Sequence, residues 1–247
     1  MRGISFIQVP TTLLAMVDSS VGGKTAIDLP SGKNLIGAFY QPESVYININ
    51  FLKTLDDNQF QSGLGEVLKY AFIEGNCCFN EPQNLMEFLI TNVNRVKSRD
   101  IYTLERLIFT CLTFKSNVVK ADEKEAGLRK VLNLGHTYGH AIETLTNYKK
   151  YTHGQCVAMG ILFIFNWALK NCYIDEEYYK VVINLLALYD FKTYKTNIKS
   201  QKIIDTMLVD KKNKNGNITF VAPLNNRVAT EKQIESIEEL KNWITQN

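Results

Sequence analysis

The sequence predicts a short α/β segment at residues 1–55, followed at residues 56–247 by a mainly α-helical domain with a small β-hairpin. Three observations support this prediction. The first 50 residues alternate short apolar runs with loops that contain Gly or Pro, as in α/β proteins. From Asp56 onward, apolar residues recur at intervals of three and four, which is typical of helices packed on a core. Near the C-terminus, a tight-turn signal precedes a run of β-forming residues.

The N-terminal segment is expected to contain two short strands. Residues 4–9 read as a strand that Pro10 ends, and residues 11–17 read as a short apolar helix. A loop follows at residues 18–25, and residues 44–48 form the second strand. Because two parallel strands do not form a stable sheet on their own, we expect this segment to be the remnant of a larger α/β domain.

The remaining residues are predicted to be mainly helical. Asp56 and Asp57 are suited to cap a helix that carries an apolar stripe. The Lys-Asn-Gly-Asn sequence at residues 214–217 indicates a tight turn before a strand at residues 218–222, so we expect a hairpin there. The expected helices span residues 57–73, 81–93, 98–121, 134–146, 154–170, 175–189, 199–208 and 231–245.

Composition excludes several classes of protein. A chain of 247 residues is long enough to bury about 70–75% of its unfolded surface. The net charge of +3 comes from scattered lysines and does not indicate a nucleic-acid partner. Five cysteines without CxxC spacing, and the lack of an apolar signal sequence, favour a reduced, cytoplasmic protein. The longest apolar run, residues 156–169, is too short for a membrane span and is expected to form a buried helix.

The three histidines of the chain all lie within 18 residues. His136 and His140 are four residues apart in a predicted helix, so both project from the same face. His153 follows a loop and precedes an apolar helix, where its imidazole could converge on the other two. Imidazole is a common zinc ligand, so this clustering favours a metal site. The alternative is three separate surface or core histidines.

A catalytic metal site usually has three protein ligands and one open position. Glu66 is a candidate ligand, because it lies among small and apolar residues of the helix at residues 57–73. A carboxylate in such surroundings is expected to be paired or bound to a metal. Lys69 lies three residues later on the same side of the helix. The alternative is an ordinary surface ion pair between these two residues.

Two short motifs combine glycine with lysine. Residues 22–25 read Gly-Gly-Lys-Thr, and residues 32–34 read Gly-Lys-Asn. The nucleoside-triphosphate loop is excluded, since it requires glycine where this chain has Asp18. A glycine-rich turn with a lysine can still bind a phosphate through backbone amides and charge. Two ordinary polar loops are an equally good interpretation.

Two charged stretches flank the helical region that carries the histidines. Residues 122–133 form a charged link, and such runs usually face solvent. Arg129 and Asn133 are nevertheless four residues apart just before the histidines, so both could reach the same site. Lys211 and Lys212 form a basic pair that is either solvent-facing or binds a phosphate.

Six motifs lie at residues 9–13 (Val-Pro-Thr-Thr-Leu), 17–25, 32–34, 37–42, 66–69 and 133–140. Together they resemble the 3-dehydroquinate synthase family, and the resemblance extends over nearly the whole chain. The family performs the second step of the shikimate pathway. It converts 3-deoxy-D-arabino-heptulosonate 7-phosphate to 3-dehydroquinate and phosphate, using NAD and a divalent metal, usually zinc. Other sugar-phosphate cyclases, metal-dependent alcohol dehydrogenases and a non-catalytic remnant are the alternatives.

The resemblance implies roles for individual residues. Glu66, His136 and His153 match the metal ligands, whereas His140 matches a catalytic histidine, so the i,i+4 pair would divide between metal binding and proton transfer. Substrate contacts are implied for Asp18, Lys69, Lys115, Arg129 and Asn133. The positions near NAD are Thr11, Thr12, Lys33 and Thr54. The phosphate end of the substrate is assigned to Lys24, Asn34 and one of Lys211 or Lys212. Arg2 matches a phosphate-contacting arginine that is contributed across a homodimer.

Two departures from the family pattern stand out. Family members carry a nucleotide-binding half, with a glycine-rich turn for the NAD pyrophosphate, ahead of the point where this sequence begins. We therefore expect a C-terminal fragment or a truncated gene product. Gln155 and Cys156 stand where many relatives have Glu-Ala, a change next to His153 that is expected to tune the metal site.

Overall fold

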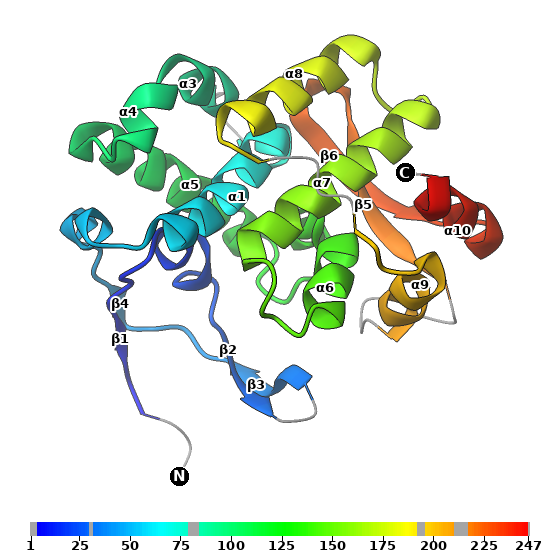
Figure 1. Cartoon of the computed structure of the whole chain (residues 1–247). Helices are drawn as coiled ribbons and strands as arrows, with labels where there is room; N and C mark the ends of the chain where they lie inside the picture. Colours follow the sequence, from blue (N-terminus) through cyan, green and yellow to red (C-terminus); the bar gives the residue numbers. More distant parts are fainter. Residues whose placement is uncertain (1–3, 30–31, 79–83, 192–195, 210–216, 247) are drawn as a thin grey trace.

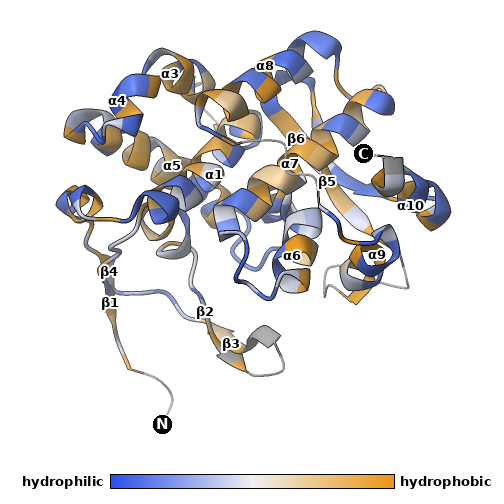
Figure 2. Ribbon diagram, viewed as in Figure 1, coloured by the Kyte–Doolittle hydropathy of each residue, from blue (hydrophilic) through white to orange (hydrophobic). Residues whose placement is uncertain are grey.

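The computed structural model shows an assembly of helices with short two-stranded sheets at its edges (Figure 1). Helix α7 (His153–Lys170) lies at its centre and packs against α1 (Asp57–Phe72), α6 (His136–Leu145) and strand β5 (Thr219–Leu224). Figure 2 shows hydrophobic residues along much of α7. The structure describes residues 4–29, 32–78, 84–191, 196–209 and 217–246, without the side chains of residues 28, 33–35 and 246.

Helix α1 confirms the predicted helix at residues 57–73. The Asp56 carboxylate caps it by accepting hydrogen bonds from the backbone N–H groups of Asn58 and Gln59, at 2.9 and 3.3 Å. Nearly every residue from Phe60 to Phe72 is buried, because α1 lies between α7 and α5 (Ile101–Ala121). Such complete burial explains why any polar group on this helix needs a partner.

Helix α7 confirms the buried helix that the apolar run predicts. Thr152 and Gln155 form a capping box at its first turn, in which each side chain accepts a hydrogen bond from the other residue's backbone N–H. The Gln155 amide also donates to Gln61 Oε1 of α1 at 3.1 Å. Gln155 therefore ties the first turn of α7, which begins with His153, to α1.

Two predicted helices differ from the structure. The helix expected at residues 81–93, of which 81–83 lie outside the described residues, is divided at Asn92 into α3 (Leu85–Thr91) and α4 (Val93–Lys97). The helix expected at 231–245 begins only at Ile237. The other described helices are α2 (Glu74–Cys77), α8 (Glu176–Leu188), α9 (Ser200–Val209), α10 (Ile237–Gln246), and the short turns η2 (Ile49–Lys53) and η3 (Leu128–Asn133).

The C-terminal hairpin joins β5 to β6 (Val228–Gln233) with Phe220 opposite Lys232 and Ala222 opposite Thr230. The predicted strand is confirmed, but its partner follows it, through the turn η4 (Asn225–Arg227). Pairing with β5 overrides the helix propensity of Glu-Lys-Gln in β6. The turn expected before β5 falls largely on residues 210–216, outside the described residues.

The N-terminal segment contains more strand than expected. Strand β2 (Lys24–Leu29) pairs antiparallel with β3 (Gly32–Phe39). The first glycine–lysine motif leads into β2, and the second lies at the start of β3, so the interpretation of 32–34 as a loop is wrong. Strands β1 (Ile7–Gln8) and β4 (Ser44–Val45) form a short parallel pair. The predicted helix at residues 11–17 is the π-helix η1 (Ala15–Ser19), which packs on α1 and α5. The domain boundary near residue 55 stays a prediction.

Candidate metal and substrate site

Helices α1 and α7 approach each other closely at two glycines. The Gly154 backbone N–H donates a hydrogen bond to Ser62 Oγ at 3.0 Å. A Cβ atom on Gly154 would lie 1.9 Å from the Ser62 carbonyl oxygen, and one on Gly65 would lie 2.5 Å from the Gly154 carbonyl oxygen. Only glycine permits this contact. It brings Glu66, which follows Gly65, face to face with His153, which precedes Gly154.

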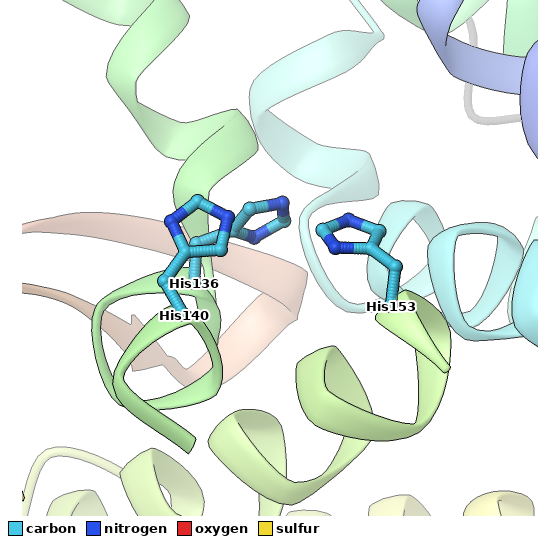
Figure 3. Close-up of side chains that lie close together, drawn as sticks. All are labelled: His136, His140 and His153. Carbon is cyan, nitrogen blue, oxygen red and sulfur yellow. The ribbon is translucent and has the colours of Figure 1, made fainter. Parts of the chain in front are cut away.

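The three histidines converge, as their spacing predicts (Figure 3). His136 and His140 project from α6 toward His153 at the start of α7. The ring centroids are 5.1 Å apart for His136 and His140, and 5.6 Å apart for His136 and His153. One nitrogen from each ring lies within 4.8 Å of the other two, so the described residues place a potential metal-ligand cluster here.

Glu66 lies against the same histidines. Its Oε1 atom is 3.3 Å from Nε2 of His136 and 3.3 Å from Nε2 of His153. The side chain is only 1% exposed, and neither carboxylate oxygen has a well-formed hydrogen bond within the described part of the chain. Lys69 forms a buried ion pair with Glu66. The pairing expected for this carboxylate is confirmed, whereas the interpretation as a surface pair is wrong.

The distances around Glu66 fit a tetrahedral divalent metal. Ligand atoms about 2.0–2.2 Å from zinc in tetrahedral geometry lie ~3.4 Å from one another. The two 3.3 Å separations from Glu66 Oε1 to the imidazole nitrogens match this value. Two histidines and one glutamate leave a fourth position open, as in catalytic zinc sites. The carboxylate and the two imidazoles therefore fit a divalent cation between them, next to the Lys69 ammonium that already pairs with Glu66.

Both candidate histidine ligands are oriented through their other ring nitrogen. His136 Nδ1 lies 3.1 Å from the Leu134 carbonyl oxygen, and His153 Nδ1 lies 3.3 Å from Glu143 Oε2. Each acceptor favours a proton on Nδ1 and leaves Nε2 directed at Glu66. Glu143 was not singled out from the sequence, although it lies seven residues after His136 and therefore on the same face of α6.

The electrostatics of the cluster keep Glu66 ionised. Burial would raise the pKa of Glu66, but Lys69 and His136 outweigh it and hold the pKa well below its usual range. Burial lowers the pKa of His136. For His153, burial acts in the same direction, but the nearby carboxylates of Glu143 and Glu66 outweigh it and raise the pKa to about 10.

A second charged cluster adjoins the first. Lys115 Nζ and Tyr70 Oη each lie 2.9 Å from Asp18 Oδ1. Burial would raise the pKa of Asp18, but Lys115 and Lys69 lower it to about 2. Because Lys69 also pairs with Glu66, the two clusters form one continuous network. The structure thus brings together Asp18, Lys69 and Lys115, as predicted, and adds Tyr70, for which the sequence contained no signal.

The charged stretch before α6 is ordered by contacts, although Glu123 and Lys124 are exposed to solvent. The Asp122 carboxylate accepts hydrogen bonds from three backbone N–H groups, including that of Arg129. Arg129 is buried and donates to the Gly22 carbonyl oxygen at 2.8 Å. Asn133 donates to Glu125 Oε1 at 2.6 Å.

Glu125 also pairs with Lys24. Two predicted site residues, Lys24 and Asn133, therefore meet at one carboxylate of the charged stretch.

The residues expected near NAD make local contacts. Thr12 Oγ1 accepts a hydrogen bond from the Ala15 backbone N–H at 3.2 Å, and Thr54 Oγ1 donates to the Phe51 carbonyl oxygen at 3.4 Å. Thr11 is exposed. Their cofactor role stays a prediction. The other residues assigned to NAD or phosphate lie outside the described side chains or residues: Lys33, Asn34, Arg2, Lys211 and Lys212.

A cavity of about 610 Å³ opens beside the metal-ligand cluster. It lies between the first turns of α1 and the loop at residues 148–152, and its wall includes Glu143 and His153. This volume lies within the range of small-molecule sites. Among the described helices, none combines the length and apolarity needed to cross a bilayer.

Solved structures identify the class of fold. ValA, the 2-epi-5-epi-valiolone synthase of Streptomyces hygroscopicus subsp. jinggangensis 5008 with NAD+ and Zn2+ bound, superposes with a TM-score of 0.86 at 19% identity, over 99% of this chain and 66% of that one. A 2-deoxy-scyllo-inosose synthase complexed with carbaglucose-6-phosphate, NAD+ and Co2+ superposes with a TM-score of 0.84 at 27% identity, over 100% of this chain and 68% of that one. The fold is that of the sugar-phosphate cyclases.

Sequence comparisons then define the family. A family model described as 3-dehydroquinate synthase C-terminal matches residues 63–213, and one described as 3-dehydroquinate synthase N-terminal matches residues 1–62. The chain belongs to the 3-dehydroquinate synthase family, which confirms the resemblance. It is 43% identical to the 3-dehydroquinate synthase of Alkaliphilus metalliredigens (strain QYMF) and 46% identical to that of Endomicrobium trichonymphae, over 90% of this chain. It spans 61% and 59% of the length of these two relatives.

Proposed function

We propose that this chain carries the metal and substrate site of a 3-dehydroquinate synthase, a lyase of the shikimate pathway to aromatic amino acids. The reaction would convert 3-deoxy-D-arabino-heptulosonate 7-phosphate to 3-dehydroquinate and phosphate. The observation that carries this proposal is the set of 3.3 Å contacts from Glu66 to His136 and His153, beside a buried network of lysine and aspartate. Relatives that bear this name at 39–46% identity support it.

The proposed cofactors are NAD and a divalent metal, zinc or cobalt. Glu66, His136 and His153 would hold the metal, whose positive charge would acidify a substrate hydroxyl, and NAD would supply reversible hydride transfer. The presence of NAD+ with Zn2+ or Co2+ in the two structural relatives supports both assignments. The NAD positions would be Thr11, Thr12, Lys33 and Thr54, and Lys24 and Asn34 would hold the phosphate end of the substrate.

The protein's own residues would fix the substrate by charge and hydrogen bonding. Lys69 and Lys115 present ammonium groups at the buried network, and Asp18 holds Lys115 in place. Asn133 and Arg129 lie on the segment that leads into α6, where an amide and a guanidinium suit hydroxyl and carboxylate groups. His140, whose ring centroid lies 5.1 Å from that of His136, would transfer protons.

Three further assignments belong to the proposal. A cytoplasmic location is supported by the absence of disulfides among the five cysteines. A homodimer would allow Arg2 to reach the phosphate of the partner's substrate. The division into an α/β part before residue 56 and a helical part after it is proposed as well, whereas the two family-model matches meet at residues 62 and 63, within α1.

The direct test is phosphate release from 3-deoxy-D-arabino-heptulosonate 7-phosphate by the purified chain with NAD and zinc. Since the chain spans about three fifths of its relatives, a second arm should co-express it with the remaining part of the A. metalliredigens enzyme. Release in either arm, abolished by Glu66→Ala, supports the proposal. No release in both arms from folded protein would contradict it and favour a binding remnant.

A further inference from the structure

The two candidate histidine ligands are oriented by acceptors of different kinds. His136 Nδ1 faces a backbone carbonyl oxygen, that of Leu134, only two residues away. His153 is the first residue of α7, its side chain is 28% exposed, and its Nδ1 atom faces the side chain of Glu143. A backbone acceptor is present whatever the sequence, whereas a side-chain acceptor depends on the residue type. The orientation of His153 is therefore the more dependent on a single residue.

Glu143 is placed for this task by its helix. It lies on α6, seven residues after His136 and three after His140, so the three side chains share the face that α6 turns toward α7. Its side chain is only 9% exposed, and a buried carboxylate is costly unless it is paired. Its Oε2 atom lies 3.3 Å from His153 Nδ1, while Nε2 of the same ring lies 3.3 Å from Glu66 Oε1.

We propose that Glu143 is a positioning residue that accepts the Nδ1 proton of His153 in a hydrogen bond and thereby directs Nε2 at the divalent metal. The proposal rests on the metal site of the proposed function. The line from Glu143 through the imidazole to the space beside Glu66 is the carboxylate–histidine–metal arrangement, in which the carboxylate fixes the tautomer and makes the imidazole a better ligand. Glu143 would not touch substrate or metal.

The adjoining cavity decides which substitution is informative. Because Glu143 and His153 both line the cavity of about 610 Å³, truncation to alanine would leave room for a water that could replace the acceptor. Glu143→Leu keeps most of the volume and removes the acceptor. Glu143→Gln keeps a neutral acceptor of the same shape. The proposal predicts that zinc affinity falls in the order Glu, Gln, Leu.

The experiment measures zinc affinity of the purified, metal-free full chain by competition with a chromophoric chelator. Loss of this kind of hydrogen bond is expected to weaken zinc binding by about 10–100-fold in Glu143→Leu, and less in Glu143→Gln. The matched control is Glu74→Gln. Glu74 is an equally buried carboxylate that accepts from the Leu85 backbone N–H and pairs with Arg227, so its loss is expected to lower stability and leave zinc affinity unchanged.

A second readout separates positioning from general stability. The ¹⁵N shifts of the His153 imidazole in the zinc-bound protein report which nitrogen carries the proton. The proposal predicts an Nδ1 proton in the parent, and a mixed or altered state in Glu143→Leu. If Leu does not fold, the same two measurements on Gln carry the test.

The proposal would be overturned if a folded Glu143 variant had the same zinc affinity and the same His153 ¹⁵N shifts as the parent. Failure of the parent itself to bind zinc would overturn the metal site as well, so the two failures are distinguishable.

Discussion

The contact between α1 and α7 predicts a strong effect of a single methyl group at Gly154. In Gly154→Ala the new Cβ atom would lie 1.9 Å from the Ser62 carbonyl oxygen, whereas real Cβ contacts essentially never fall below 3.0 Å. The two helices must therefore separate locally by at least about 1.1 Å, the difference between these values. If the whole shift lay along the line from Glu66 Oε1 to His153 Nε2, their 3.3 Å separation would grow to about 4.4 Å.

At that limit the separation exceeds what one metal ion can span, and a smaller component of the shift still distorts the tetrahedral geometry. Two ligands about 2.1 Å from a metal reach at most ~4.2 Å apart, and then only in a straight line. We expect zinc affinity to fall by about 100-fold or more, comparable with the loss of a ligand's support. Overpacking should also lower the free energy of unfolding by about 1–3 kcal/mol. Helix propensity alone would act in the opposite direction, since alanine stabilises a helix by roughly 0.5–1 kcal/mol relative to glycine.

The assay combines urea unfolding with zinc titration by chelator competition. Gly75→Ala is the matched control, because its Cβ would lie 2.9 Å from the Asn226 carbonyl oxygen and no site residue is involved. It should cost less stability and leave zinc affinity unchanged. A Gly154→Ala variant that is as stable as the parent or more stable, with unchanged zinc affinity, would refute the argument that the glycine contact sets the Glu66–His153 distance.

Three further predictions concern single side chains. His136→Ala should abolish zinc retention, measured by metal analysis, while His140→Ala keeps the metal and loses turnover; equal metal loss in both would show that the roles are not divided. Lys69→Met should destabilise the metal-free chain by about 3–5 kcal/mol, because Glu66 is left as an unpaired buried charge, and clearly less with zinc bound. Urea unfolding that shows the same loss of stability with and without zinc would contradict this. The pKa of Asp18 is lowered from 3.8 to about 2, so its carboxylate should contribute about 2 kcal/mol to the free energy of unfolding above pH ~4, and this contribution is lost as the pH falls through 2. The stability difference between the parent and Asp18→Asn should therefore shrink between about pH 5 and about pH 2.5. A difference that stays constant over this range would count against the pairing with Lys115.

Long, strongly periodic elements could be predicted from the sequence. Helices α1, α5 and α7 were identified because apolar residues at helical spacing need no information about distant partners. Strand β6 was missed because its residues favour a helix, and only pairing with β5 decides their conformation. The β2–β3 hairpin was missed for the same reason, since its Gly-, Lys- and Asn-containing ends also suit loops.

The candidate site was predictable to the extent that it is local in sequence. The four-residue spacing of His136 and His140 placed both on one helix face, and the apolar neighbours of Glu66 indicated that its carboxylate needed a partner. Tyr70 could not be predicted, because its contact with Asp18 joins residues 52 positions apart. Glu125 was misjudged because a charge run resembles a solvated surface until its partners are known.

The most direct test of the account is a crystal structure of the zinc-loaded chain with anomalous diffraction recorded at the zinc absorption edge. The account predicts one anomalous peak about 2.0–2.2 Å from a Glu66 carboxylate oxygen and from Nε2 of both His136 and His153, with His140 outside the coordination shell. A peak bound by the three histidines without Glu66, or no peak between α1, α6 and α7, would contradict it.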